Sequence, residues 1–124
     1  MPVAGHRDLL VWQRAVELAI ASYDLTKFFP KSEAYGLSSQ LQRAAVSISA
    51  NIAEGKGRGS TGAYLNHLGI AAGSLAELDT QVEVARRLGY VKSEHAQNVI
   101  EKIEEVGRML TGLRKSLEGR IPKS

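Results

Sequence analysis

The 124-residue chain contains no cysteine. This absence excludes disulfide bonds, thiolate metal ligands and cysteine nucleophiles, and it fits the reducing cytoplasm in which we expect the protein to reside. No apolar run approaches the roughly 18 residues that a membrane-spanning helix needs. The N-terminal sequence MPVAGHRDLL also lacks the apolar core of a signal peptide. We therefore expect no membrane partner.

A strong excess of one charge is also missing. The sequence carries 16 Lys and Arg against 13 Asp and Glu, which gives a net charge of +3. So small a basic excess permits a nucleic-acid partner without requiring one. The length and the hydrophobic fraction of 44% are those of a single globular domain, which we expect to span residues 1–124.

Hydrophobic spacing predicts four helices, at about residues 8–28, 38–54, 61–88 and 93–117, and no strand. Residues that favour helix ends mark several of these boundaries: Asp8 and Ser93 as N-terminal caps, Pro30 after the first helix, and Gly55 and Gly89 as stops. Because the connections are short, neighbouring helices should run antiparallel. The predicted fold is an all-α, up-down-up-down antiparallel four-helix bundle.

The second predicted helix has two different faces. An apolar stripe at helical spacing contains Leu41, Ala44, Ala45, Ile48 and Ile52. A polar stripe at the same spacing contains Gln40, Arg43, Ser47, Asn51 and Glu54. Small side chains fill much of the remaining surface, and they allow another helix to approach closely. We therefore expect the polar stripe to face protein, at least in part.

The third helix offers partners for this stripe. If the turn between the two helices centres near Arg58, antiparallel pairing brings Arg43 close to Ser74, Gln40 close to Glu77 and Asn51 close to Asn66. A charge-assisted hydrogen bond between Arg43 and Glu77 is then within reach. We interpret these residues as a polar network that fixes helix register, because buried polar groups can specify register. The competing interpretation, acid–base catalysis, lacks a histidine beside a serine.

Other enzymatic and metal motifs are weak or absent. The three histidines, His6, His67 and His95, are not preceded three residues earlier by glutamate, so the di-metal motif of helical bundles is missing. Residues 57–62 match G-x-G-x-x-G by letters, but a helix precedes them where a dinucleotide-binding motif needs a strand. We expect no catalytic residue, no metal and no cofactor.

The glycine-rich loop places cations beside a helix N-terminus. Lys56 and Arg58 flank Ser60 and Thr61, where free N–H groups and the helix dipole favour an anion such as a phosphate. There are three further candidates for phosphate binding: Arg86 and Arg87, which close the third helix, and Lys92, which lies just beyond it. Each cation alone could simply stabilise a helix terminus, but symmetry in an oligomer would multiply the charge.

The first helix carries more apolar surface than one bundle face needs. Its apolar residues point in several directions: Leu9, Leu10, Val11, Trp12, Val16, Leu18 and Ile20. They are either buried within one subunit or used for self-association, which we favour because contiguous exposed apolar patches mark interaction sites.

Several segments, taken in order, resemble a known family. Residues 8–15, 35–37, 39–48, 51–55 and 73–78 are similar to the four-helix bundle proteins encoded within intervening sequences of bacterial 23S ribosomal RNA genes. More distantly, they resemble the accessory variability proteins of diversity-generating retroelements, which are basic pentamers that bind nucleic acid. The resemblance implies a bundle subunit in a ring of five and does not imply catalysis. The family's recurring polar positions correspond to Arg43, Asn51, Glu54, Ser74 and Glu77.

Together these observations predict a non-enzymatic homo-oligomer that binds RNA or DNA through backbone phosphates. The alternative is a scaffold that presents its helices to a nucleic-acid-processing protein. Affinity for RNA that depends on salt distinguishes the first from the second.

Overall fold

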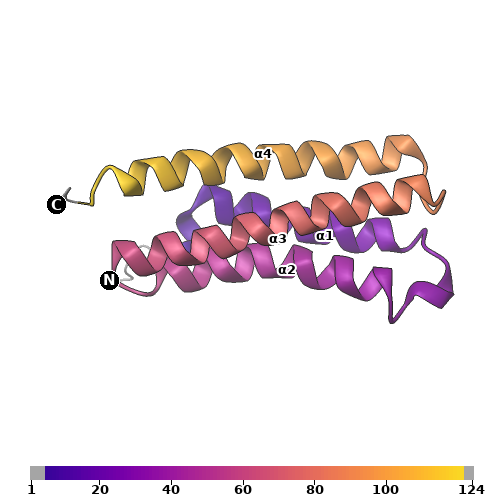
Figure 1. Cartoon of the computed structure of the whole chain (residues 1–124), viewed down its shortest axis with the longest axis horizontal. Helices are drawn as coiled ribbons and strands as arrows, with labels where there is room; N and C mark the ends of the chain where they lie inside the picture. Colours follow the sequence, from indigo (N-terminus) through magenta and orange to yellow (C-terminus); the bar gives the residue numbers. More distant parts are fainter. Residues whose placement is uncertain (1–4, 122–124) are drawn as a thin grey trace.

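Four long helices make up most of the chain. The computed structural model describes residues 5–121, and within that range it contains helices and turns but no strand (Figure 1). The helices are α1 (Leu10–Thr26), α2 (Leu37–Lys56), α3 (Thr61–Arg87) and α4 (Ser93–Glu118). Short 3-10 turns precede α1 at His6–Asp8 and α2 at Lys31–Glu33. The all-α fold predicted from hydrophobic spacing is confirmed.

The helices lie side by side and alternate in direction (Figure 1). Each packs against its neighbours along the chain, and α4 closes the bundle by packing against α1. This up-down-up-down topology gives the bundle two ends. The α2–α3 turn lies at the same end as the start of α1 and the finish of α4, and we call this the loop end. The α3–α4 turn lies at the opposite, far end.

Every helix contributes to one apolar core. The stripe predicted on α2 is buried, with Leu41, Ala45, Ile48 and Ile52 fully removed from solvent. The regularly spaced apolar residues of α3 and α4 meet it in the same cluster: Leu68, Ala71, Leu75, Leu78, Val82, Ala85, Ala96, Val99, Ile103, Val106, Leu110 and Leu117. Spacing of three and four residues suits helices that cross at shallow angles, so the pattern in the sequence and the packing agree.

Three residues that were predicted to cap or stop a helix do not do so in the structure. Asp8 lies in the first 3-10 turn, and α1 begins at Leu10 without a side-chain cap. Ser93 is the first residue of α4, and Lys92 takes the N-cap position. Gly55 lies inside α2, which continues to Lys56. These predictions were wrong because capping preferences are local, whereas packing decides how far a helix extends.

Gly89 does end α3, as predicted. It has φ +78°, a conformation that favours glycine. Its N–H donates to the carbonyl of Arg86 at 3.1 Å, and the N–H of Tyr90 donates to the carbonyl of Ala85 at 3.0 Å. This pair of bonds satisfies the last carbonyls of the helix in a Schellman motif and turns the chain into α4.

A carboxylate joins the two turns at the far end. Glu33 accepts hydrogen bonds from the N–H of Leu37 at 3.0 Å and from the hydroxyl of Tyr90 at 2.7 Å. The bond from Leu37, followed by that from Tyr90, lowers the pKa of Glu33 below its ordinary value. The same contact raises the pKa of the Tyr90 hydroxyl. The connection between α1 and α2 is thus tied to the α3–α4 turn.

Candidate nucleic-acid interface

Three residues of the predicted polar network join α2 to α3 through hydrogen bonds. The hydroxyls of Ser47 and Ser74 lie 2.9 Å apart. The amide of Asn51 donates to the carbonyl of Ser47 at 2.9 Å and to its hydroxyl at 3.1 Å. On its other side, the amide oxygen of Asn51 lies 3.2 Å from Nδ1 of His67. All four side chains are half-buried, so this part of the polar stripe faces protein.

The predicted pairing of α2 with α3 was wrong by about one helical turn at Ser74 and by one residue at Asn51. Ser47, rather than Arg43, meets Ser74, and His67, rather than Asn66, meets Asn51. The turn itself, residues 57–60 between α2 and α3, centres near Arg58 as predicted, so the difference lies in how the two helices pack and not in the position of the turn. His67 was therefore missed, although it adjoins the residue that the sequence indicated.

The remaining members of the predicted network lie at the surface. Gln40, Arg43 and Glu77 are exposed, and no hydrogen bond joins Arg43 to Glu77 within residues 5–121. Glu77 instead accepts a bond of 3.4 Å from Gln81 on the next turn of α3. The network is accordingly smaller than the stripe, because these three side chains are exposed to solvent.

Arg58, one of the two cations predicted at the loop, is already paired. Its guanidinium donates to the carboxylate of Glu54 at 2.6 Å. This bond, and next the nearby His67, lower the pKa of Glu54. Both side chains are about half exposed, and surface pairs of this kind contribute little to stability, so an anion could displace Glu54. Glu54 thus pairs with a residue of the loop and does not join the predicted network.

The two arginines at the end of α3 share one carboxylate. Glu83 accepts two hydrogen bonds from Arg86, at 3.0 and 2.6 Å, and one from Arg87 at 2.7 Å. These bonds lower the pKa of Glu83 to about 2 and raise that of Arg86. Part of the positive charge that the sequence offers here is therefore neutralised within the helix.

Glu83 should titrate at an unusually low pH. We expect its carboxyl resonance to change with a midpoint near pH 2, against an ordinary value of 4.5. Because the folded-state pKa is depressed, the stabilisation it provides is complete above pH 4.5 and is lost as the pH falls through about 2. NMR titration of the double variant Arg86→Gln/Arg87→Gln should move the midpoint back toward 4.5; an unchanged midpoint would contradict this assignment.

The two groups of predicted phosphate-binding residues lie at opposite ends of the bundle (Figure 1). The 27 residues of α3 separate them by about 40 Å at 1.5 Å per residue. At the loop end, residues 5–8, 54–61 and 112–121 carry six Lys or Arg against three Asp or Glu. At the far end, residues 24–36 and 83–95 carry five against four. The loop end is therefore the more cationic surface.

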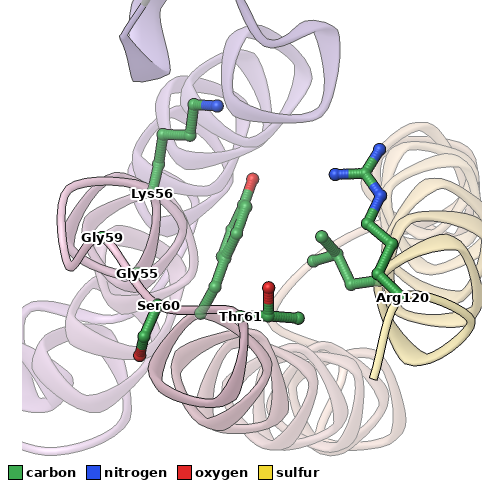
Figure 2. Close-up of a pocket in the computed structure, with 8 residues that line it drawn as sticks. Gly55, Lys56, Gly59, Ser60, Thr61 and Arg120 are labelled. Atoms are coloured by element: carbon green, nitrogen blue, oxygen red, sulfur yellow. The ribbon is translucent and has the colours of Figure 1, made fainter. Parts of the chain in front are cut away.

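A recess of about 170 Å³ lies at the loop end, between the α2–α3 turn and the last residues of α4. We call it the loop-end recess. Its lining includes Lys56 from α2, Thr61 and Tyr64 from α3, and Leu117 and Arg120. Figure 2 shows Lys56 and Arg120 on opposite sides of the space, with the Thr61 hydroxyl directed between them. Arg58 is not among its lining residues.

The α3 N-terminus opens into this recess. Ser60 caps the helix by accepting a hydrogen bond from the N–H of Ala63 at 3.2 Å. In Figure 2 the Ser60 side chain points away from the recess, whereas Thr61 borders it. The earliest N–H groups of a helix have no partner within the helix, and the helix dipole adds partial positive charge at this position. The environment is suited to an anion.

The part of the chain that the structure describes contains neither a cluster of metal ligands nor a membrane-spanning helix. Within residues 5–121, no three His, Cys, Asp or Glu side chains gather where they could hold a metal ion. None of the helices in this range is both long enough and apolar enough to cross a membrane.

Comparison with known proteins gives two findings. The family model described as 23S rRNA-intervening sequence protein matches residues 7–112. The crystal structure of a protein of unknown function from the S23 ribosomal protein family of Bacteroides thetaiotaomicron is similar, with a TM-score of 0.80 and 26% sequence identity. The match covers 86% of this chain and 99% of that one. No curated protein matches the chain.

Proposed function

The chain belongs to the 23S rRNA-intervening sequence protein family, and from this premise we propose that it is a non-enzymatic helical bundle that binds RNA or DNA through backbone phosphates. The observation that carries the proposal is the loop end, where cations outnumber acidic residues by six to three. Phosphate contacts supply most of the sequence-independent affinity of nucleic-acid-binding proteins. An open cationic surface with a helix N-terminus is suited to such contacts.

The cations contribute unequally in this proposal. Lys56 takes part in no ion pair within the described range, so its charge is available at once. Arg58 has to exchange Glu54 for phosphate, and Arg86 and Arg87 have to leave Glu83. Lys92 lies with the latter two at the far end. We therefore assign the main contact to the loop end and an auxiliary one to the far end.

We further propose that the subunits assemble, with the five copies that the family resemblance implies, through a groove between α1 and α2. The groove has a volume of about 530 Å³, and its apolar lining includes Val16, Ile20, Tyr23 and Val46. Ile20 is 60% exposed, a large apolar side chain left in water. Asp24 and Lys27, which form an ion pair of 3.0 Å, border the same groove and give its rim both signs of charge, which suits contact with a second copy.

RNA binding should weaken steeply with salt. For each phosphate neutralised, the slope of log affinity against log salt is about −0.9 for duplex DNA and −0.7 for single strands. We expect the double variant Lys56→Gln/Arg58→Gln to reduce the slope by about one to two, since each lost phosphate contact removes about one. The pair Arg86→Gln/Arg87→Gln should reduce it less. Fluorescence anisotropy with labelled RNA at several salt concentrations measures both.

Lys102→Gln on α4 is the matched control, because it removes one positive charge away from both ends. Its slope should equal that of the wild type. No binding at low ionic strength, or binding indifferent to salt, would refute the proposal. In that case the scaffold alternative gains support, and a protein partner should be retained by the Lys56→Gln/Arg58→Gln variant.

The location of the protein in the cytoplasm stays a prediction.

A further inference from the structure

The loop-end recess brings together cations from segments far apart in the sequence. Lys56 closes α2, whereas Arg120 follows α4, and both line the same space of about 170 Å³. Neither takes part in an ion pair within residues 5–121, in contrast to Arg58 in the neighbouring loop. Two like charges facing one recess repel each other, and an anion between them would offset that repulsion.

Tyr64 supplies a second, independent observation. It lines the recess, and its hydroxyl is buried without a hydrogen-bond partner in the described range. A buried polar group left unpaired is destabilising, so a partner is expected. Burial raises the pKa of the phenol, which keeps it protonated and able to donate. The ammonium of Lys56 lies 6.0 Å from the centroid of the same ring.

We propose that the loop-end recess binds one phosphate group, with Lys56 and Arg120 as its cationic partners and the hydroxyls of Thr61 and Tyr64 as donors. The recess, with a volume of about 170 Å³, has room for a tetrahedral anion. Under the proposed function, on which this inference rests, that phosphate belongs to an RNA or DNA strand whose remaining nucleotides lie outside.

Arg120 and Tyr64 carry the test, because the charge pattern of the loop alone would not single them out. Arg120→Gln should weaken RNA binding by about tenfold, the loss typical of one charge-assisted hydrogen bond. Arg108→Gln, which removes an exposed arginine from the middle of α4, is its matched control and should bind within about twofold of the wild type.

Tyr64→Phe separates a ligand contact from a structural role. It removes only the unpartnered hydroxyl, so the protein without ligand should be as stable as the wild type or more stable. Its affinity for RNA should nevertheless fall by about threefold to tenfold, the loss of one neutral hydrogen bond. A variant that is destabilised, or that binds RNA as the wild type does, would overturn the role of Tyr64.

Inorganic phosphate and two oligonucleotides identify the source of the phosphate group. Titration with inorganic phosphate, followed by amide NMR, should shift the signals of Thr61 and Tyr64 in the wild type but not in Arg120→Gln. RNA with a 5′-phosphate and the same RNA with a 5′-hydroxyl should bind equally if the recess holds a backbone phosphate. Preference for the phosphorylated strand would assign a terminal monoester, and both results support the recess.

The inference and the proposed function fail in different ways. If RNA binds in a salt-dependent manner but Arg120→Gln and Tyr64→Phe bind as the wild type, the recess is overturned and the function stands. If inorganic phosphate shifts Thr61 while RNA does not bind, the function is overturned and the phosphate site stands.

Discussion

Replacing Ile20 by glutamate is expected to convert the proposed assembly into single chains of 13.4 kDa. Ile20 is 60% exposed in the subunit and lines the groove between α1 and α2. At an interface between copies it would be buried, and a carboxylate buried there without a partner costs several kcal/mol. Since every 1.4 kcal/mol is tenfold, association should weaken by more than about 100-fold at each contact. Light scattering at micromolar concentration measures the mass.

Ile70→Glu provides the matched control for this experiment. Ile70 is an isoleucine on an exposed position of α3, 46% exposed, and it does not line the groove. Glutamate favours helix at least as well as isoleucine, so neither variant should unfold the subunit. We expect Ile70→Glu to keep the mass of the wild type. A wild-type protein that is already monomeric would remove both the interface and the multiplication of charge by symmetry.

Replacing Gly55 by alanine should destabilise the bundle by about 1–3 kcal/mol, the usual cost of overpacking. A Cβ at this position would lie 2.7 Å from the Cβ of His67 and 3.1 Å from Cδ1 of Tyr64. Because the Cβ of His67 is fixed to the backbone, α2 and α3 would have to separate. This separation should weaken the hydrogen bond between Asn51 and His67 and displace Tyr64 from its position in the recess.

Gly73→Ala is expected to have the opposite effect. Gly73 lies in the interior of α3, and a Cβ there would meet nothing within 4 Å. Alanine in an exposed helix position is more stable than glycine by roughly 0.5–1 kcal/mol. Urea denaturation in the Ile20→Glu background measures both free energies without a contribution from association. Equal effects of the two substitutions would mean that the close approach at Gly55 is absent.

Ion pairing decides which of the predicted cations are free to bind a phosphate. The sequence predicted five phosphate-binding cations, Lys56 and Arg58 first and then Arg86, Arg87 and Lys92. In the structure, Arg86 and Arg87 hold Glu83 and Arg58 holds Glu54, whereas Lys56 lines an open recess. The sequence contained part of this, because acidic residues stand three or four positions before each paired arginine, a spacing that favours ion pairs on a helix.

Arg120 and Tyr64 could not have been assigned in this way. They are separated by 56 positions, and no spacing rule connects the end of α4 with the first turn of α3. Only the closed bundle, in which α4 returns to the end where α3 begins, places them at one recess. The same holds for His67, whose contact with Asn51 depends on how α2 packs against α3 and lies one residue away from the predicted pairing.

The sequence by itself determined the number of helices, their order and their buried faces, because burial of apolar side chains at helical spacing is a local pattern repeated over many residues. Leu41, Ile48 and Ile52 were assigned to the core on that basis, and they are fully buried. Tertiary structure alone decided the register of α2 against α3, the burial of Gly55 and the placement of Lys56 and Arg120 at one recess. Those features depend on distances between segments, which change by a full helical turn when a single connection is a few residues longer or shorter.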